Sequence, residues 1–412
     1  MIRRLFLILA LTAGVAFAQN ITLNALFMQQ AAYSTDNVKA MTADFEKANP
    51  GVKVNLEFVS YEALHNKIVT SEAAGHGYDV VLFDVIWPAE FATNHILRNI
   101  TSDIPQSMID KVWSGAWTTV KYKDQYYGIP WILDTKYLYY NKKMLQEAGI
   151  SNPPTTWDEL AKDAKIIKDK GIVKYPMVWS WQQAEAIMCD YTTLLSAYGG
   201  SYFDQNNNPT FQTGGGLKAL QYMNQTLKDG ISNPASTESL EEDVRRIFSS
   251  GQAAFALNWT YMYNLANDPK QSKVAGDVGI EPAPGDGTNS QMSAVNGSMG
   301  LGVTTSSKHP NEALKYIEFL TSQKEQNQYA KLSLPIWKSS YDNPDVTKGQ
   351  EALIAAAKKA LPVMYPRPML VHYQQFSNTF QAALNNVLIG NETPTKGLDT
   401  VAQQIKQQGL NK

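Results

Sequence analysis

The sequence predicts an α/β protein made of two units, each a sheet with helices packed on it. Three observations support this prediction. Strands and helices alternate in the order β-α-β-α-β up to residue 84, which is typical of a parallel sheet with covering helices. A similar succession of helix and short apolar strand recurs after about residue 127. The chain also has 412 residues, enough for two or three domains.

The strands of the first unit are short and largely apolar. The stretch ITLNALFM at 21–28 is the expected first strand. Residues 52–58 alternate apolar and polar side chains, as a half-buried second strand does. The run DVVLF at 79–83 has no such alternation and is expected to be buried on both faces.

Helices are expected between and after these strands. Val38, Met41 and Phe45 recur at helical spacing, and a second helix is expected over 61–74. Two later helices are expected to begin with a capping box, Thr156 with Glu159 and Ser239 with Glu242. The last of these leads directly into QAAFALNWTY, a short apolar strand that ends in polar and aromatic residues. From about residue 350 the chain is expected to be mainly helical.

The N-terminus is typical of a secretory signal peptide. Arg3 and Arg4 precede an apolar run, and Ala16-Phe17-Ala18 matches a cleavage site. We therefore expect cleavage after Ala18 and a secreted, periplasmic protein. The residue directly after the cleavage site is Gln19 and not Cys, so we expect no lipid anchor. Cys189 is the single cysteine; it has no disulfide partner within the chain and is expected to be a small buried residue.

Composition and motifs narrow the function. The formal net charge is −2, so no basic bias indicates nucleic acid as a partner. The sequence has no catalytic elbow, no phosphate-binding loop and no His spacing typical of a metal site, so we expect neither a metal nor a cofactor. Aromatic residues reach 11%, which favours surfaces that hold a ligand by stacking.

Four separate segments carry candidate ligand-binding side chains. Asp84 ends the third strand, and ligands of open α/β sheets lie at the carboxyl ends of strands; its alternative role is to cap the following turn. A hinge is expected near residue 128, where Gly128 and Pro130 interrupt a Tyr-rich strand. Trp131 and Asp134 follow it; their alternative roles are core packing for Trp131 and a structural salt bridge for Asp134. Trp259 lies in NWTYMY at another strand end. Arg367 lies between two prolines, with a surface charge as its alternative.

Together these segments supply acceptors, donors and flat apolar rings. A neutral polyhydroxylated ligand needs that combination, because each buried hydroxyl left unpaired costs free energy. A mostly apolar cleft with a few directed polar groups is the general form of such sites.

The order of several segments is similar to that of a known family. They are MTADFEKANPGVKVNLEFV, DVVLFDVIW, YGIPWILDTKYLYYNKKMLQEAGI, IFSSGQAAFALNWTYM and SSKHPNEALKYIEFLTSQKEQ. The chain resembles the family-1 extracellular solute-binding proteins of bacterial ABC sugar importers, and is most similar to the trehalose/maltose-binding branch. The resemblance covers essentially the whole mature chain and implies a non-enzymatic sugar carrier that delivers its cargo to membrane permease subunits, with a monomer expected.

The resemblance also implies site residues. Four of them match positions that contact sugar in that branch: Asp84, Asp134, Trp259 and Arg367. Three more match positions that line the cleft or lie beside the sugar: Glu185, Gly297 and Met299.

Three departures from the branch leave the identity of the sugar open. Met299 stands where the branch usually has Trp. Gln29 or Gln30 replaces a Glu, and His65 or Asn66 replaces an Arg.

The implied fold is the periplasmic-binding-protein fold, with two α/β lobes, a ligand cleft between them and crossing hinge strands. Residues 19–127 with about 302–345 would form the N-terminal lobe, and 128–301 with about 346–412 the C-terminal lobe. The chain would cross near residue 128, near 297–303 and near 339–347.

Three alternatives remain at this stage. A protein of the same fold would bind another solute, such as glycerol phosphate, a polyol or a longer oligosaccharide. A secreted glycosidase would need two carboxylates at catalytic separation. A sensor would deliver the ligand to a chemoreceptor instead of a permease.

Overall fold

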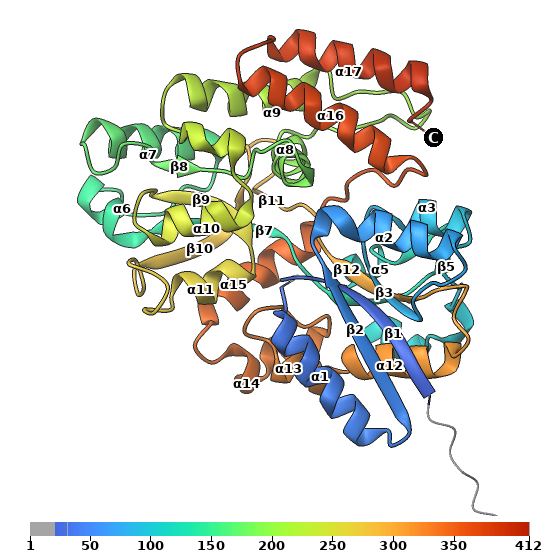
Figure 1. Ribbon diagram of the computed structural model, residues 1–412. Coiled ribbons are helices and arrows are strands. Elements are labelled where there is room, and N and C mark those ends of the chain that lie inside the picture. The colour runs from blue at the N-terminus through green and yellow to red at the C-terminus, as the bar shows by residue number, and fades with distance from the viewer. Residues whose placement is uncertain (1–20, 31, 412) are drawn as a thin grey trace, which may run out of the picture.

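Two sheets, each covered by helices, form two lobes in the computed structural model, which describes residues 21–30 and 32–411 (Figure 1). The expected signal peptide lies outside these residues. Figure 1 shows the N-terminal lobe at the lower right and the C-terminal lobe at the upper left, with the chain passing between them. The predicted α/β class is confirmed.

The N-terminal lobe contains a five-stranded mixed sheet. Its strands, in spatial order, are β2 (Val52–Val59), β1 (Ile21–Met28), β3 (Val80–Asp84), β12 (Met299–Val303) and β6 (Ile129–Ile132). β1 pairs in parallel with both β2 and β3, as the alternating pattern predicts. β12 runs antiparallel to β3 and to β6. A two-stranded ribbon, β4 (Lys121–Tyr122) and β5 (Gln125–Tyr126), lies apart from this sheet.

The C-terminal lobe contains a second five-stranded sheet. Its order is β11 (Met292–Ser293), β10 (Val278–Pro284), β7 (Lys136–Asn141), β9 (Phe255–Trp259) and β8 (Met177–Val178). Only β8 and β9 pair in parallel, and the other pairs are antiparallel. The strand predicted from QAAFALNWTY is therefore β9, next to the centre of this sheet.

Helices cover both sheets. On or near the first lie α1 (Thr35–Ala48), α2 (Tyr61–Ala73), α3 (Pro88–Thr93), α4 (Gln106–Lys111), α5 (Ser114–Trp117), α12 (Pro310–Leu320) and α13 (Gln323–Gln328). Around the second lie α6 (Lys142–Ala148), α7 (Trp157–Asp169), α8 (Glu185–Ala197), α9 (Gly214–Lys228), α10 (Glu241–Ser249), α11 (Tyr261–Ala266), α15 (Glu351–Ala360), α16 (Tyr373–Leu388) and α17 (Pro394–Gln408). The short α14 (Pro344–Thr347) links α13 to α15.

The helix starts explain why these segments are helical. The predicted capping box of α7 is confirmed: Thr156 Oγ1 accepts from the N–H of Glu159, and the Glu159 carboxylate accepts from the N–H of Thr156. The predicted box at Ser239 and Glu242 is wrong. α10 starts at Glu241, and the Asp243 carboxylate accepts from the N–H of Leu240. Because the helix begins one residue later than predicted, Glu242 has no capping role.

The sheets also locate the passages between lobes. β6 belongs to the N-terminal sheet, so the first passage runs through 133–135, several residues after the predicted position near 128. β12 belongs to the same sheet, so the return passage is 294–298, before most of the predicted 297–303 segment. A third passage leads through α14 to α15, which packs on β10. The full lobe boundaries remain a prediction.

Within residues 21–30 and 32–411, no helix has the length and apolar character needed to cross a membrane. The same residues contain no group of three or more His, Cys, Asp or Glu side chains arranged to hold a metal ion.

Candidate functional site between the lobes

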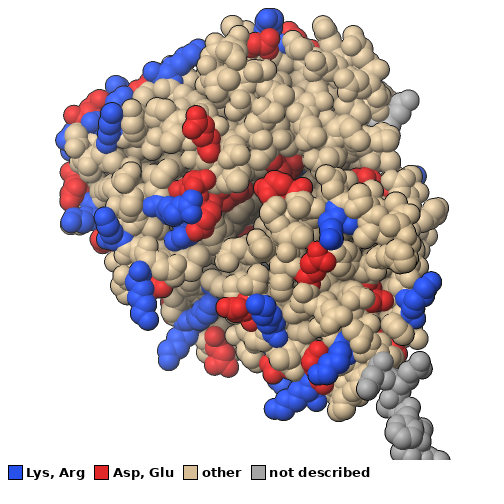
Figure 2. Space-filling view, in the orientation of Figure 1, with Lys and Arg blue, Asp and Glu red and all other residues tan. Residues whose placement is uncertain are grey.

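A cavity of about 400 Å³ lies between the two lobes, at the ends of strands from both sheets. Seven of the eight side chains or glycines predicted from the sequence line it: Asp84, Asp134, Glu185, Trp259, Gly297, Met299 and Arg367. Figure 2 shows the hollow between the lobes with acidic side chains around it. Asp84 and Arg367, which are 283 residues apart in the sequence, therefore meet here.

Asp84 lies at the carboxyl end of β3, where the buried run Val80–Phe83 delivers it. Its Oδ1 accepts from the N–H of Ile86 at 3.2 Å, so the turn-capping alternative is also correct. Its Oδ2 accepts from the Tyr61 hydroxyl at 3.1 Å. Burial raises the pKa of Asp84, and the neighbouring Arg367 guanidinium opposes that effect. The geometry therefore confirms the turn-capping role and places Asp84 on the cavity wall, while its ligand-binding role stays a prediction.

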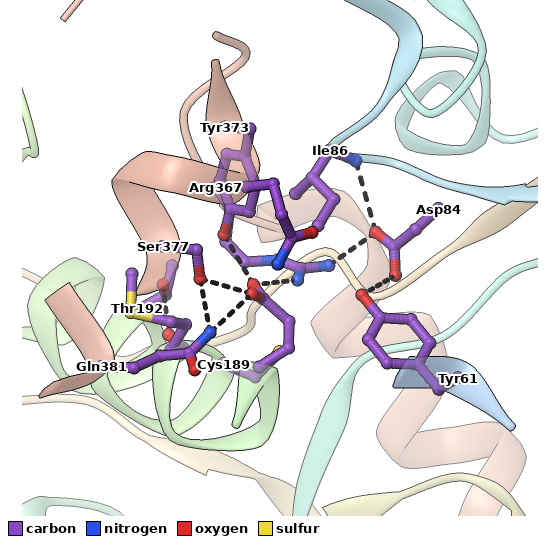
Figure 3. A network of polar contacts seen from close by, with 12 residues as sticks. Tyr61, Asp84, Ile86, Cys189, Thr192, Arg367, Tyr373, Ser377 and Gln381 are labelled. Carbon is purple, nitrogen blue, oxygen red and sulfur yellow. Dashed lines mark hydrogen bonds and ion pairs between the residues drawn. The ribbon is translucent and has the colours of Figure 1, made fainter. Parts of the chain in front are cut away.

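Arg367 lies between two carboxylates and is not a surface charge, since it is only 3% exposed. Its Nη2 donates to Asp84 Oδ1 at 2.9 Å, and its Nη1 donates to Glu185 Oε1 at 2.6 Å. Figure 3 shows the guanidinium extending towards Asp84 on one side, with Tyr373, Ser377 and Gln381 on the other. Two charge-assisted hydrogen bonds to a planar fork fix the direction of the side chain.

Glu185 is the first residue of α8 and accepts several hydrogen bonds from α16. The Tyr373 hydroxyl donates to its Oε1 at 2.6 Å, and the Ser377 hydroxyl donates to its Oε2 at 2.5 Å. Cys189, one turn further along α8, also lines the cavity, and burial raises the pKa of its thiol to about 12. Cys189 is buried, as the sequence predicts.

Asp134 ties the first interlobe passage to the end of β9. Its Oδ1 accepts from the N–H of Thr135 at 2.9 Å, and from the N–H and hydroxyl of Thr260 at 3.1 and 2.5 Å. Its alternative role as a structural salt bridge is wrong, because these partners are neutral. Burial raises the pKa of Asp134 to about 7.

Trp259 provides a partly exposed aromatic ring at the end of β9. Its Nε1 donates to Glu241 Oε1 at 3.2 Å, and Lys136 Nζ lies 5.0 Å from the ring centroid. A Cβ atom added to Gly297 would lie 2.3 Å from the ring, closer than real contacts allow. Gly297 is therefore needed to make room for the indole.

Lys136, whose Nζ lies near the Trp259 ring, is itself held in place by buried hydrogen bonds. It is fully buried, and its Nζ donates to Asp190 Oδ1 at 2.5 Å and to the Ser180 hydroxyl at 2.8 Å. Burial raises the pKa of Asp190 to about 6, although the Lys136 ammonium opposes the shift. This pair stabilises the position of Lys136 next to the indole.

Trp131 is the predicted site residue that does not line the cavity. It is 1% exposed and packs against Tyr33 and Phe27, with ring centroids 4.9 and 5.4 Å away. Its neighbour Ile132 lines the cavity instead. Adjacent strand residues point to opposite faces, so the core-packing alternative for Trp131 is correct.

The residues that differ from the trehalose/maltose-binding branch do not all lie at the cavity. Gln29, Gln30 and Met299 line the cavity. His65 does not; its Nε2 lies 2.8 Å from a carboxylate oxygen of Glu90.

Several lining residues were not predicted from the sequence: Tyr61, Glu62, Glu241 and Glu242. Tyr61 and Glu62 begin α2 immediately after β2, so the strand-end rule that found Asp84 applies to them too. Glu242 was assigned a capping role from the sequence, which was incorrect, and its neighbour Glu241 was not considered as a cavity residue.

The cavity is acidic. Six carboxylates line it: Glu62, Asp84, Asp134, Glu185, Glu241 and Glu242. Arg367 is the one Lys or Arg among the lining residues that the structure describes. It is already bonded to two of these acids, so the arrangement can accept hydrogen bonds from hydroxyl groups but offers little to an anion.

A profile of the bacterial extracellular solute-binding protein family matches residues 31–327. The chain belongs to this family. A probable ABC transporter-binding protein of Deinococcus radiodurans is 28% identical over 338 residues, which is 79% of each chain. Because such relatives are ABC transporter-binding proteins, this solute-binding protein is a carrier and not an enzyme.

Solved structures show the same two-lobe fold. The maltose-bound MalE3 of T. maritima has a TM-score of 0.86 and 27% identity, covering 94% of this chain and 99% of that one. A solute-binding protein of Thermotoga lettingae with bound α-D-tagatose has a TM-score of 0.84 and 26% identity, with the same coverage. The fold of this solute-binding protein is therefore that of ABC sugar-binding proteins.

Proposed function

We propose that this protein captures a neutral sugar, a disaccharide or short α-glucoside such as trehalose or maltose, and delivers it to the permease subunits of an ABC importer. The observation that carries the proposal is the Trp259 ring, partly exposed in a cavity whose lining also includes six carboxylic acid side chains. The apolar C–H face of a sugar packs on a flat ring, and carboxylate oxygens accept its hydroxyl protons. Relatives of the same fold hold maltose and α-D-tagatose.

Ligand contacts from both lobes would drive closure. Asp84 belongs to the N-terminal sheet and Trp259 to the C-terminal sheet, so a ligand that touches both gains most when the lobes approach. A ligand shifts the equilibrium by this difference in affinity. Hinge closure around a ligand is a known motion of periplasmic binding proteins.

Secretion is part of the proposal. The leader would be removed after Ala18, leaving a non-lipidated, monomeric periplasmic protein. Intact-mass measurement of protein purified from the periplasm tests this, because a chain beginning at Gln19 differs in mass from every other processed form.

A ligand panel tests the function. Calorimetry with trehalose, maltose, sucrose, glucose, maltotriose, mannitol and glycerol phosphate should identify at least one neutral sugar that binds and also raises the melting temperature. The stabilisation should grow with the logarithm of ligand concentration, because the ligand binds only the folded state. Binding of glycerol phosphate alone would contradict the proposal.

A further inference from the structure

Arg367 joins side chains that belong to different lobes. Asp84 ends β3 of the N-terminal sheet, and Glu185 begins α8, which packs in the C-terminal lobe. The guanidinium bonds both at once, at 2.9 and 2.6 Å. The side chains of Arg367, Asp84 and Glu185 are only 1%, 7% and 10% exposed, so water screens these contacts weakly.

Each carboxylate is also held firmly by its own lobe. The N–H of Ile86 and the Tyr61 hydroxyl bond Asp84 from the N-terminal side. On the C-terminal side, Glu185 accepts from three residues of α16: Tyr373, Ser377 and Gln381. Both acids are therefore held in place, and the guanidinium bonds to each of them. Figure 3 shows its contact with Asp84.

The charges make this bridge hard to replace. Two buried acids share one base, and burial together with Glu185 raises the pKa of Asp84 while Arg367 lowers it. Without Arg367, two carboxylates of like charge would face each other across the cleft with weak screening. They would repel, and separation of the lobes would relieve the repulsion.

We propose that Arg367 is a positioning residue that clasps the two lobes before any ligand arrives, by binding Asp84 of one lobe and Glu185 of the other. In this role it orients the Asp84 carboxylate and reduces the range of open conformations of the empty protein. The part that concerns ligand orientation rests on the proposed function. The clasp itself does not, because its contacts are between side chains of the protein and its test adds no sugar.

Electron spin resonance distance measurement on ligand-free protein tests the clasp. Spin labels at Asn94→Cys, after α3, and Lys218→Cys, on α9, lie at exposed positions of the two lobes. Cys189 lines the cavity that these variants should open, so it is replaced by alanine in every labelled protein. We expect Glu185→Gln and Arg367→Met to lengthen and broaden the interlobe distance distribution. Arg367→Lys should give an intermediate result, because one ammonium lacks the two-pronged fork.

A matched control is Glu90→Gln, which weakens a contact with His65 inside the N-terminal lobe and should leave the distance unchanged. Circular dichroism confirms that each variant is folded. Unchanged distributions in the folded Glu185→Gln and Arg367→Lys variants would overturn the clasp. Because no sugar is added, this result is independent of the ligand panel, and either idea can fail without the other.

Discussion

At the scale of single residues, the site depends on a missing side chain as much as on those present. Gly297 leaves room for the Trp259 indole, and Glu241 fixes its N–H. A large partly buried ring of this kind contributes through area and through the matching of its face to the ligand. The orientation of the indole is therefore set by its neighbours.

A double-mutant cycle tests this orientation. Trp259→Ala should weaken binding of the best sugar by roughly 1–3 kcal/mol, through loss of the aromatic surface. Gly297→Ala should weaken binding too, since its Cβ would displace the ring. In the Trp259→Ala background the same Gly297 substitution should have little further effect. Calorimetry measures all four proteins, and additive losses would show that Gly297 acts through something other than the ring.

Asp134 gives the protein a pH dependence with a definite sign. Its pKa rises from 3.8 to about 7 on folding, so the folded state retains a proton that the unfolded chain releases. The free energy of unfolding should therefore fall as pH rises from about 4 to about 7. Relative to Asp134→Asn, the wild type should lose roughly 2 kcal/mol between pH 5 and 7.

Urea unfolding of both proteins at several pH values measures this difference. The pKa of Asp190 is also raised, to about 6, but it is present in both proteins and cancels. Parallel stability curves for wild type and Asp134→Asn would show that Asp134 keeps an ordinary pKa.

At the scale of elements, side-chain capping at helix starts should contribute measurably to stability. The N-cap of α7 is bonded by its own side chain, whereas that of α9, Thr213, makes no side-chain capping bond. Thr156→Ala should cost about 1 kcal/mol of stability, and the matched control Thr213→Ala much less. Denaturant unfolding compares the two. Equal losses would mean that the capping bond of α7 contributes nothing measurable.

Strand ends also explain what the sequence could predict. An apolar run followed by a polar or aromatic residue predicted that Asp84 and Trp259 lie at strand ends, and both line the cavity. The same rule did not separate Trp131 from Ile132, because IPWIL has no alternation to show which face meets the core. Register is settled by packing, here of Trp131 on Tyr33 and Phe27.

Glu241 and Glu242 show a second kind of failure. Capping chemistry favours a helix start at Ser239 with Glu242, because Leu240 has no side-chain acceptor. The structure nevertheless starts the helix one residue later, with Leu240 as the N-cap and its N–H bonded by Asp243. Local capping energies of about 1 kcal/mol do not decide between such phases, and tertiary contacts do.

At the scale of the whole molecule, the charge of the cavity favours some ligands over others. Six carboxylates and one already-bonded guanidinium line it. Trehalose 6-phosphate should therefore bind at least about tenfold more weakly than trehalose, a difference of about 1.4 kcal/mol. Calorimetry at two salt concentrations should show the gap narrowing at high salt, because ions screen the repulsion. A phosphorylated sugar that bound equally well would mean that the acids do not face the ligand.

The most direct test is a crystal structure grown with the tightest-binding sugar of the panel. The account predicts sugar density in the cavity between the lobes, with a ring stacked on Trp259 and a hydroxyl donating to Asp84. Density at any other place, or a sugar in the cavity that touches only one lobe, would contradict it.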